Sequence, residues 1–168
     1  NTPVAVRRVG GHALLVNQTA INLSKLTKDT KVSGGEIIVK NGKMTGVLVD
    51  AAMHFIHIPQ PSKKEQIQAL LDAQKKSFDL GLTTVDDAGL SRQTIELIDS
   101  LQQSGDLKMK VYAMVSVSDQ NLDHFLSKGI IKTERLTVRS FKVYGDGALG
   151  SRGAAMKQPY SDRENHHG

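Results

Sequence analysis

The chain has 168 residues, of which 39% are hydrophobic and 23% charged; this is the size and composition of one ordinary globular domain and excludes a disordered or fibrous protein. Its formal net charge is +5, but the basic residues are scattered and only 4% of residues are aromatic, so we expect no nucleic-acid binding. Cysteine is absent, which excludes a disulfide framework and a thiolate metal site but identifies no compartment.

Apolar stretches such as residues 111–117 are much shorter than the roughly 20 residues that a membrane-spanning helix needs, so we expect no membrane partner. The chain begins with Asn-Thr-Pro-Val, without an initiator methionine or a targeting peptide. We therefore expect a chain that has been processed or cut.

Residues 1–60 are predicted to form a small β-rich part. Residues 4–9 are rich in β-branched side chains and predict a strand. Residues 12–26 carry leucine and isoleucine at roughly helical spacing and predict a helix. Residues 36–40 and 43–49 predict a β-hairpin, because the Asn41-Gly42 dipeptide between them best tolerates the positive φ angles of a type I′ turn.

Residues 61–168 show a different pattern, in which helices alternate with strands after the linker-like Pro59-Gln60-Pro61. Three helices are expected, with start signals at Ser62 and Glu65 (a capping box), Ser91 and Asp119, and end signals at Gly81, Gly105 and Gly129. Strands are expected at 82–88, 108–117 and 136–144. This alternation predicts an α/β fold with about three parallel strands, taken either from an incomplete (β/α)8 barrel or from an open doubly wound sheet.

The segment after the last expected strand contains the glycine pattern G-x-G-x-x-G at residues 145–150. In that position the pattern is compatible with dinucleotide or anion binding, but Pro159 interrupts the chain before a long helix and a further strand could form. One alternative is therefore a non-catalytic α/β module that binds an anion or nucleotide through the Gly145–Gly150 loop. A glycine-rich loop that merely turns the chain is another.

The same segment, FKVYGDGALGSRGAA at residues 141–155 followed by PYSD at 159–162, strongly resembles the signature F-K-x-x-x-D-G-x-L-G-S-R-x-A-A…P-Y-x-D of amidohydrolase family 3. The resemblance continues in order through nearly the whole chain. It includes RRVGGHA at 7–13 with Asn17, GGEI at 34–37, TGVL at 45–48 and GLTTVDDAG at 81–89.

This resemblance implies part of a (β/α)8 barrel with a small β-rich insertion and a divalent metal, most naturally zinc, at the carboxyl ends of the strands. In such enzymes a metal-activated water attacks an amide-like carbon. Lys142 matches the metal-bridging lysine of the family. An ammonium group has no lone pair, so the expected species is a carbamate formed from the neutral amine and carbon dioxide. The alternative for Lys142 is a lysine on the solvent side of a half-exposed strand.

The resemblance also assigns roles to loop residues. Asp146 is the candidate catalytic carboxylate, and His12, Gly147 and Arg152 are candidate substrate-binding residues. For Asp146 the alternative is an acceptor of backbone donors in a turn, and for His12 it is a histidine packed at a helix start. His54 and His57 could share a helical face as metal ligands, but no further ligand lies near them in the sequence.

The family's His-x-His pair and its later histidine and aspartate ligands have no counterpart here. Since catalytic zinc sites typically use three protein ligands, we expect this polypeptide to be inactive by itself, and its uncovered barrel surfaces to allow self-association. The parent's substrate is expected to be a small amide-like molecule whose identity depends on loops that are mostly absent.

Overall fold

The computed structural model describes residues 2–168, which form two compact units. The first unit contains the chain up to Pro59 together with Tyr144–Gly168, and the second is Gln60–Val143. The sequence-based division grouped residues 61–168, whereas contacts within the chain group the last segment with the first unit. The division of the parent protein into domains stays a prediction.

None of the helices formed by residues 2–168 has both the length and the apolar character that crossing a bilayer requires.

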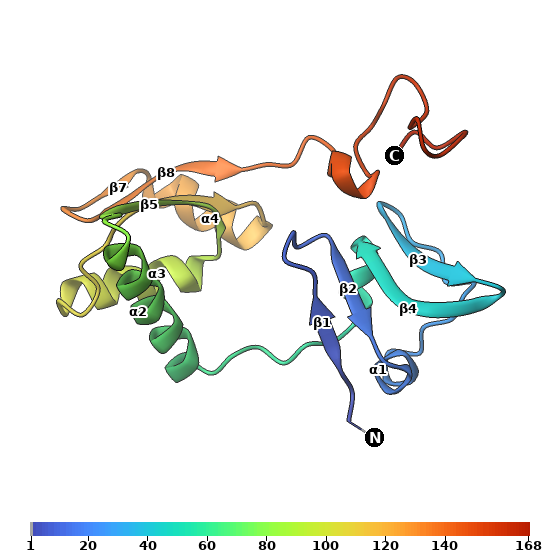
Figure 1. The fold of residues 1–168 in the computed structure, drawn as a ribbon. Helices are drawn as coiled ribbons and strands as arrows, with labels where there is room; N and C mark the ends of the chain where they lie inside the picture. Colours follow the sequence, from blue (N-terminus) through green and yellow to red (C-terminus); the bar gives the residue numbers. More distant parts are fainter. Residues whose placement is uncertain (1) are drawn as a thin grey trace. The chain divides into compact units, whose positions relative to one another are not determined.

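The first unit contains an antiparallel four-stranded sheet with the order β1-β2-β4-β3 (Figure 1). Its strands are β1 (Ala5–Arg7), β2 (Ala13–Val16), β3 (Gly35–Lys40) and β4 (Lys43–Asp50). The expected hairpin is confirmed: β3 and β4 are joined by Asn41 and Gly42, whose φ angles of 52° and 72° are those of a type I′ turn. Two 3-10 turns, η1 (Ala51–Phe55) and η2 (Leu149–Ser151), also belong to this unit.

The helix predicted over residues 12–26 was wrong in its first half. Residues 13–16 form β2, and only α1 (Gln18–Leu23) is helical. Leu14 and Val16 are buried while Leu15 between them is 53% exposed, which is the period of two of a strand with one face in the core. Helix α1 starts where the side chain of Asn17 accepts a hydrogen bond from the amide of Ala20. Eight buried side chains of this unit form one cluster: Leu14, Val16, Ala20, Ile21, Leu26, Leu48, Ala52 and Ile56.

The second unit alternates helices and strands, and its sheet has the order β5-β6-β8-β7. Its elements are α2 (Lys63–Asp79), β5 (Thr84–Leu90), α3 (Arg92–Gln103), β6 (Lys110–Ser116), α4 (Asp119–Lys128), β7 (Ile131–Lys132) and β8 (Leu136–Lys142). The capping box of Ser62 with Glu65 and the cap at Ser91 are confirmed. Strands β5, β6 and β8 are parallel as expected, and the short antiparallel strand β7 is an addition that the sequence pattern did not predict.

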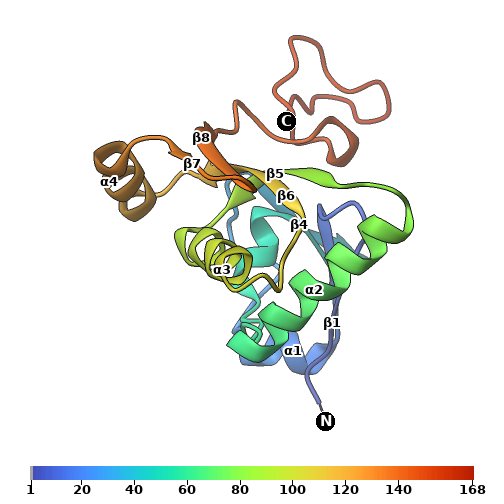
Figure 2. The same ribbon diagram turned by 90° about the vertical axis from the view of Figure 1, so that its left-hand side faces the viewer.

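The helices of the second unit pack against one face of this sheet. Val111, Ala113 and Val115 of β6 are buried and lie in one cluster with Ile95 and Ile98 of α3. Figures 1 and 2 show α2 and α3 on the same side of the strands. The alternate residues of β6 are only half-buried and therefore lie on the other face of the sheet. The α/β class is thus confirmed, whereas the eight-stranded barrel stays a proposal.

Candidate functional site

Lys142 is the last residue of β8, at the carboxyl edge of the parallel sheet. It is the register partner of Ser116, the last residue of β6. A side chain at Gly89 of β5 would place its Cβ 3.3 Å from Oγ of Ser116 and 3.9 Å from Cγ of Lys142. Three neighbouring strands therefore bring a glycine, a hydroxyl and a half-buried lysine together at the edge where parallel α/β sheets carry their sites.

The residues around Lys142 do not by themselves make a metal site. Within residues 2–168, no group of three or more histidine, cysteine, aspartate or glutamate side chains is arranged to hold an ion. A hydroxyl and an amine that must first lose its proton are poor ligands for a divalent cation without added carboxylates or imidazoles. Residues 2–168 therefore supply Lys142 as a candidate ligand but no complete ligand set.

A second polar group lies nearer the middle of the same sheet face. The hydroxyls of Tyr112 and Ser140 are 3.0 Å apart, Nε of Arg139 donates to the Tyr112 hydroxyl at 3.4 Å, and the guanidinium lies 5.5 Å from the centre of the Tyr112 ring. The hydrogen bond with Ser140, followed by that from Arg139, lowers the pKa of Tyr112. Sequence reasoning missed this group because its side chains come together only through a register shift between β6 and β8 near Val138.

His12 lies immediately before β2 and is paired with the last residue of β4. Its Nδ1 is 2.8 Å from Oδ1 of Asp50, while Oδ2 of Asp50 accepts a hydrogen bond from Oγ of Ser151 at 2.7 Å. Asp50 is 17% exposed and His12 is 51% exposed, so a shielded carboxylate supports an accessible imidazole. Sequence reasoning identified His12 and missed both of its supports, although Ser151 lies inside the signature segment.

Asp146 and Gly147 shape the loop that contains them. Oδ2 of Asp146 accepts a hydrogen bond from the amide of Ala155 at 3.0 Å, a bond that spans nine positions and closes the loop between them. A side chain at Gly147 would clash with the carbonyl oxygen of Gly153 and lie 2.5 Å from its carbonyl carbon. The close approach that Gly147 permits is thus to another part of the same loop. Its role toward substrate, like that of Asp146, stays a prediction.

The guanidinium of Arg152 forms an ion pair with Asp162 through Nε and Nη2; its Nε lies 3.0 and 3.1 Å from the two carboxylate oxygens. This hydrogen bonding raises the pKa of Arg152 and lowers that of Asp162. Nε2 of His166 also lies 2.8 Å from the backbone carbonyl oxygen of Arg152. The substrate-binding role of Arg152 stays a prediction. To bind substrate, its guanidinium would have to contact substrate and Asp162 together, or leave Asp162.

A second arginine holds the loop to the hairpin of the same unit. Arg163 binds Glu36 of β3 in a bidentate manner, with Nη1 2.7 Å and Nη2 2.9 Å from the two carboxylate oxygens. The hydrogen bond from Arg163 holds the pKa of Glu36 below its ordinary value. Together with the Ser151–Asp50 bond, this pair fixes residues 146–163 on the β3–β4 side of the first unit.

The glycine-rich loop does not have the form of a dinucleotide fingerprint. It leads into the three-residue turn η2, whereas a fingerprint opens a helix that packs on the sheet. Gly147, the second glycine of the pattern, instead packs closely on Gly153 of the same loop.

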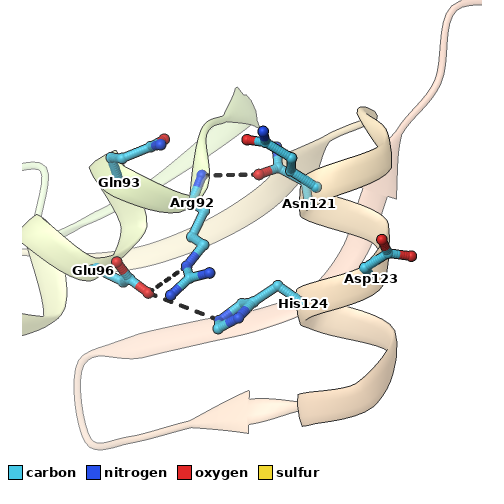
Figure 3. Close-up of a pocket in the computed structure, with 7 residues that line it drawn as sticks. Arg92, Gln93, Glu96, Asn121, Asp123 and His124 are labelled. Carbon is cyan, nitrogen blue, oxygen red and sulfur yellow. Dashed lines mark hydrogen bonds and ion pairs between the residues drawn. The ribbon is translucent and has the colours of Figure 1, made fainter.

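An open hollow of about 640 Å³ lies between the first turns of α3 and α4 (Figure 3). Nε of Arg92 donates to Oε1 of Glu96 at 2.7 Å, and Nε2 of His124 lies 3.8 Å from the same oxygen. The hydrogen bond from Arg92 lowers the pKa of Glu96. The ring of His124 packs edge-on against Phe125, as expected for a histidine beside the apolar face of a helix. The charges of Arg92 and Glu96 satisfy each other, and neither residue belongs to the signature segment.

His54 and His57 do not share a helical face. Turn η1 ends at Phe55, so only His54 lies in it, while His57 lies outside any helix or strand. A metal pair of His54 and His57, which the sequence did not favour, has no support in the part of the chain that the structure describes.

Comparison with known proteins gives consistent matches. The chain is 29% identical over 183 aligned residues to the protein LONG AFTER FAR-RED 3 of Arabidopsis thaliana, covering 99% of this chain and 31% of that protein. It is 28% identical over 169 residues to the putative amidohydrolase YtcJ of Bacillus subtilis (strain 168), covering 95% of this chain and 32% of that protein.

Among solved structures, the chain matches an uncharacterized metal-dependent hydrolase from Pyrococcus horikoshii OT3 with a TM-score of 0.69 and 25% identity, over 99% of this chain and 34% of that one. A similar hydrolase from Pyrococcus furiosus, at 24% identity and a TM-score of 0.68, covers 100% of this chain and 35% of its own and shares the fold. The chain spans about a third of the length of these relatives. The model of the Amidohydrolase family matches residues 1–168, and the chain therefore belongs to that family.

Proposed function

We propose that this chain is part of a longer metal-dependent hydrolase that cleaves carbon–nitrogen bonds, other than peptide bonds, in small amide-like molecules. The observation that carries the proposal is the place of Lys142, at the carboxyl edge of a parallel sheet and inside the signature segment. Support comes from the family and from the likeness to the Pyrococcus horikoshii protein, a metal-dependent hydrolase.

In this proposal the neutral amine of Lys142 would add to carbon dioxide with release of a proton, and the resulting carbamate would help to hold a divalent metal, zinc by preference. A metal of this kind lowers the pKa of a bound water and so supplies a nucleophile near neutral pH. A side chain at Gly89 would press on Oγ of Ser116 at 3.3 Å, so glycine avoids a tight contact at this edge of the sheet. The other ligands would come from the rest of the protein, so we expect the 168-residue chain alone to be inactive.

The three parallel strands would be part of a (β/α)8 barrel, whose inner face would carry Tyr112, Ser140 and Lys142. In the isolated chain that face has no covering layer within the second unit, which would favour self-association. In the parent, Asp146 would be the catalytic carboxylate, while His12, Gly147 and Arg152 would contact substrate. Asp146 is exposed and already oriented by one backbone hydrogen bond, which is compatible with such a role.

The test uses the full-length protein that contains this chain. Metal content is measured by mass spectrometry, and hydrolysis is measured with a panel of N-acyl and N-formyl compounds. Both are done for wild type, Lys142→Ala and the control Lys110→Ala. Lys110 is an exposed lysine at the opposite end of β6. We expect bound metal and activity in wild type and in the control, and loss of both in Lys142→Ala.

The carbamate is tested separately, by ¹³C NMR after incubation with labelled bicarbonate. We expect a carbamate signal in wild type that is missing in Lys142→Ala. A metal-free protein, or activity that is insensitive to Lys142→Ala, would refute the proposal.

A further inference from the structure

Asp50 is the centre of a hydrogen-bonded group that joins three segments of the first unit. One carboxylate oxygen faces Nδ1 of His12 at 2.8 Å, and the other accepts the hydroxyl of Ser151 at 2.7 Å. The backbone amide of Asp50 also donates to the carbonyl oxygen of His12 at 3.2 Å. His12 and Asp50 are thus fixed to each other both through their backbones and through their side chains.

This arrangement determines which nitrogen of His12 carries the proton. An ionised carboxylate can only accept hydrogen bonds, so the ring nitrogen that faces it must be the donor. Neutral His12 then carries its proton on Nδ1 and a lone pair on Nε2. The ring is 51% exposed, and within residues 2–168 Nε2 makes no hydrogen bond. The lone pair is therefore presented away from Asp50 and is available to a ligand.

The backbone of Asp50 indicates that its carboxylate is needed at this place. Its φ of 46° and ψ of −119° lie in a region that side chains of L-residues rarely adopt and that glycine adopts readily. Strained residues of this kind persist where surrounding contacts hold them, and they gather at functional sites. Here the contacts are the hydrogen bonds to His12 and Ser151.

Ser151 limits the positions that the carboxylate can take. Its hydroxyl is held between Oδ2 of Asp50 and the carbonyl oxygen of Ala148, 3.1 Å away. A carboxylate with one oxygen fixed by Ser151 cannot rotate freely, so its other oxygen stays directed at His12. The signature segment thereby fixes the orientation of a histidine that lies far away in the sequence.

We propose that Asp50 and Ser151 are positioning residues that hold His12 as its Nδ1–H tautomer, so that Nε2 accepts a hydrogen bond from an N–H or O–H group of the substrate. The tautomer follows from the geometry of the first unit alone. The identity of the bound group rests on the proposed function, because amide-like substrates carry N–H groups.

The test is long-range ¹H–¹⁵N NMR of the full-length protein labelled on histidine, with His12 assigned by His12→Asn. Wild type is compared with Asp50→Asn, Ser151→Ala and the control Asp29→Asn, which removes an exposed aspartate of the same unit that pairs with Lys28. We expect an unprotonated Nε2 in wild type and in the control. Asp50→Asn should shift a large part of His12 to the Nε2–H tautomer, because an amide can also donate to Nδ1, and Ser151→Ala should do so partly.

Steady-state hydrolysis then tests the ligand. Loss of one oriented hydrogen bond to substrate should raise KM about tenfold in Asp50→Asn and leave kcat within about twofold. An Nε2–H tautomer in wild type, or a tautomer unaffected by Asp50→Asn, would overturn the positioning. A changed tautomer with an unchanged KM would overturn the role in substrate binding. Absence of hydrolysis in every sample would refute the proposed function, while the tautomer would still decide the positioning.

Discussion

Replacing Gly147 with alanine should open the loop of residues 146–155, although the substitution adds a single methyl group. The new Cβ would clash with the carbonyl oxygen of Gly153 and lie 2.5 Å from the carbonyl carbon, where ordinary contacts exceed 3.0 Å. Gly153 cannot easily withdraw, because its amide donates to Ala148 at 3.0 Å. Overpacking of this kind typically costs about 1–3 kcal/mol, and loss of the neighbouring Ser151–Asp50 bond would add about 1–2 kcal/mol.

Native-state hydrogen exchange of the loop amides measures this local effect, which global unfolding could miss. We expect protection at the amides of Gly153 and Ala155 to fall at least tenfold in Gly147→Ala, for the free energies given above. Gly150→Ala is the matched control, since a Cβ at Gly150 would meet nothing within 4 Å and Gly150 does not have a positive φ angle. Unchanged protection in Gly147→Ala, or equal loss in Gly150→Ala, would refute the steric argument.

Substitutions at three positions test contacts of the first unit by urea unfolding. Arg163 lowers the pKa of Glu36 from its ordinary value of 4.5, so the pair stabilises the fold above that pH and loses its effect as the pH falls through the lower folded pKa. Glu36→Gln should therefore cost about 0.5–1 kcal/mol at pH 7 and progressively less as the pH falls through the lowered folded pKa of Glu36, and a pH-independent cost would contradict the pairing. Asp50→Gly should be less destabilising than Asp50→Ala by about 1 kcal/mol, because both lose the hydrogen bonds but only glycine relieves the backbone; equal costs would argue against strain. Leu48→Ala should cost about 2–5 kcal/mol, since Leu48 is completely buried, and a cost below 1 kcal/mol would mean that its cluster is not a packed core.

Elements with local chemical signals were the ones that could be predicted from the sequence. The capping box at Ser62 and the Asn41-Gly42 turn are each determined by a few neighbouring residues, and the structure confirms both. The prediction for residues 13–16 was wrong because a short apolar run is compatible with both a helix and a strand. Pairing with β1 and β4 on either side makes this run a strand, and those partners lie elsewhere in the sequence.

The candidate site was predictable only where the signature itself carried the information. The sequence placed Lys142 within a strand over residues 136–144, and the structure ends that strand, β8, at Lys142. Its role as a metal ligand stays a prediction. The Arg152–Asp162 pair lies within the signature, so the spacing of its arginine and aspartate could have revealed it. Asp50 was missed because it meets Ser151 across 101 positions of the chain, and no local pattern relates two such residues.

Neighbouring residues of the signature have different physical roles. Lys142 ends a strand of the second unit, whereas Asp146 belongs to the first unit and holds the amide of Ala155. Loss of activity on replacing Asp146 therefore has two explanations, a lost catalytic carboxylate or an opened loop. Asp146→Asn separates them, because the amide oxygen still accepts from Ala155 while the charge and the basic oxygen are gone. If Asp146 is catalytic, we expect activity of the full-length protein to fall at least a hundredfold while exchange protection at Ala155 stays within about threefold of wild type. Parallel loss of both would show that Asp146 acts only by shaping the loop.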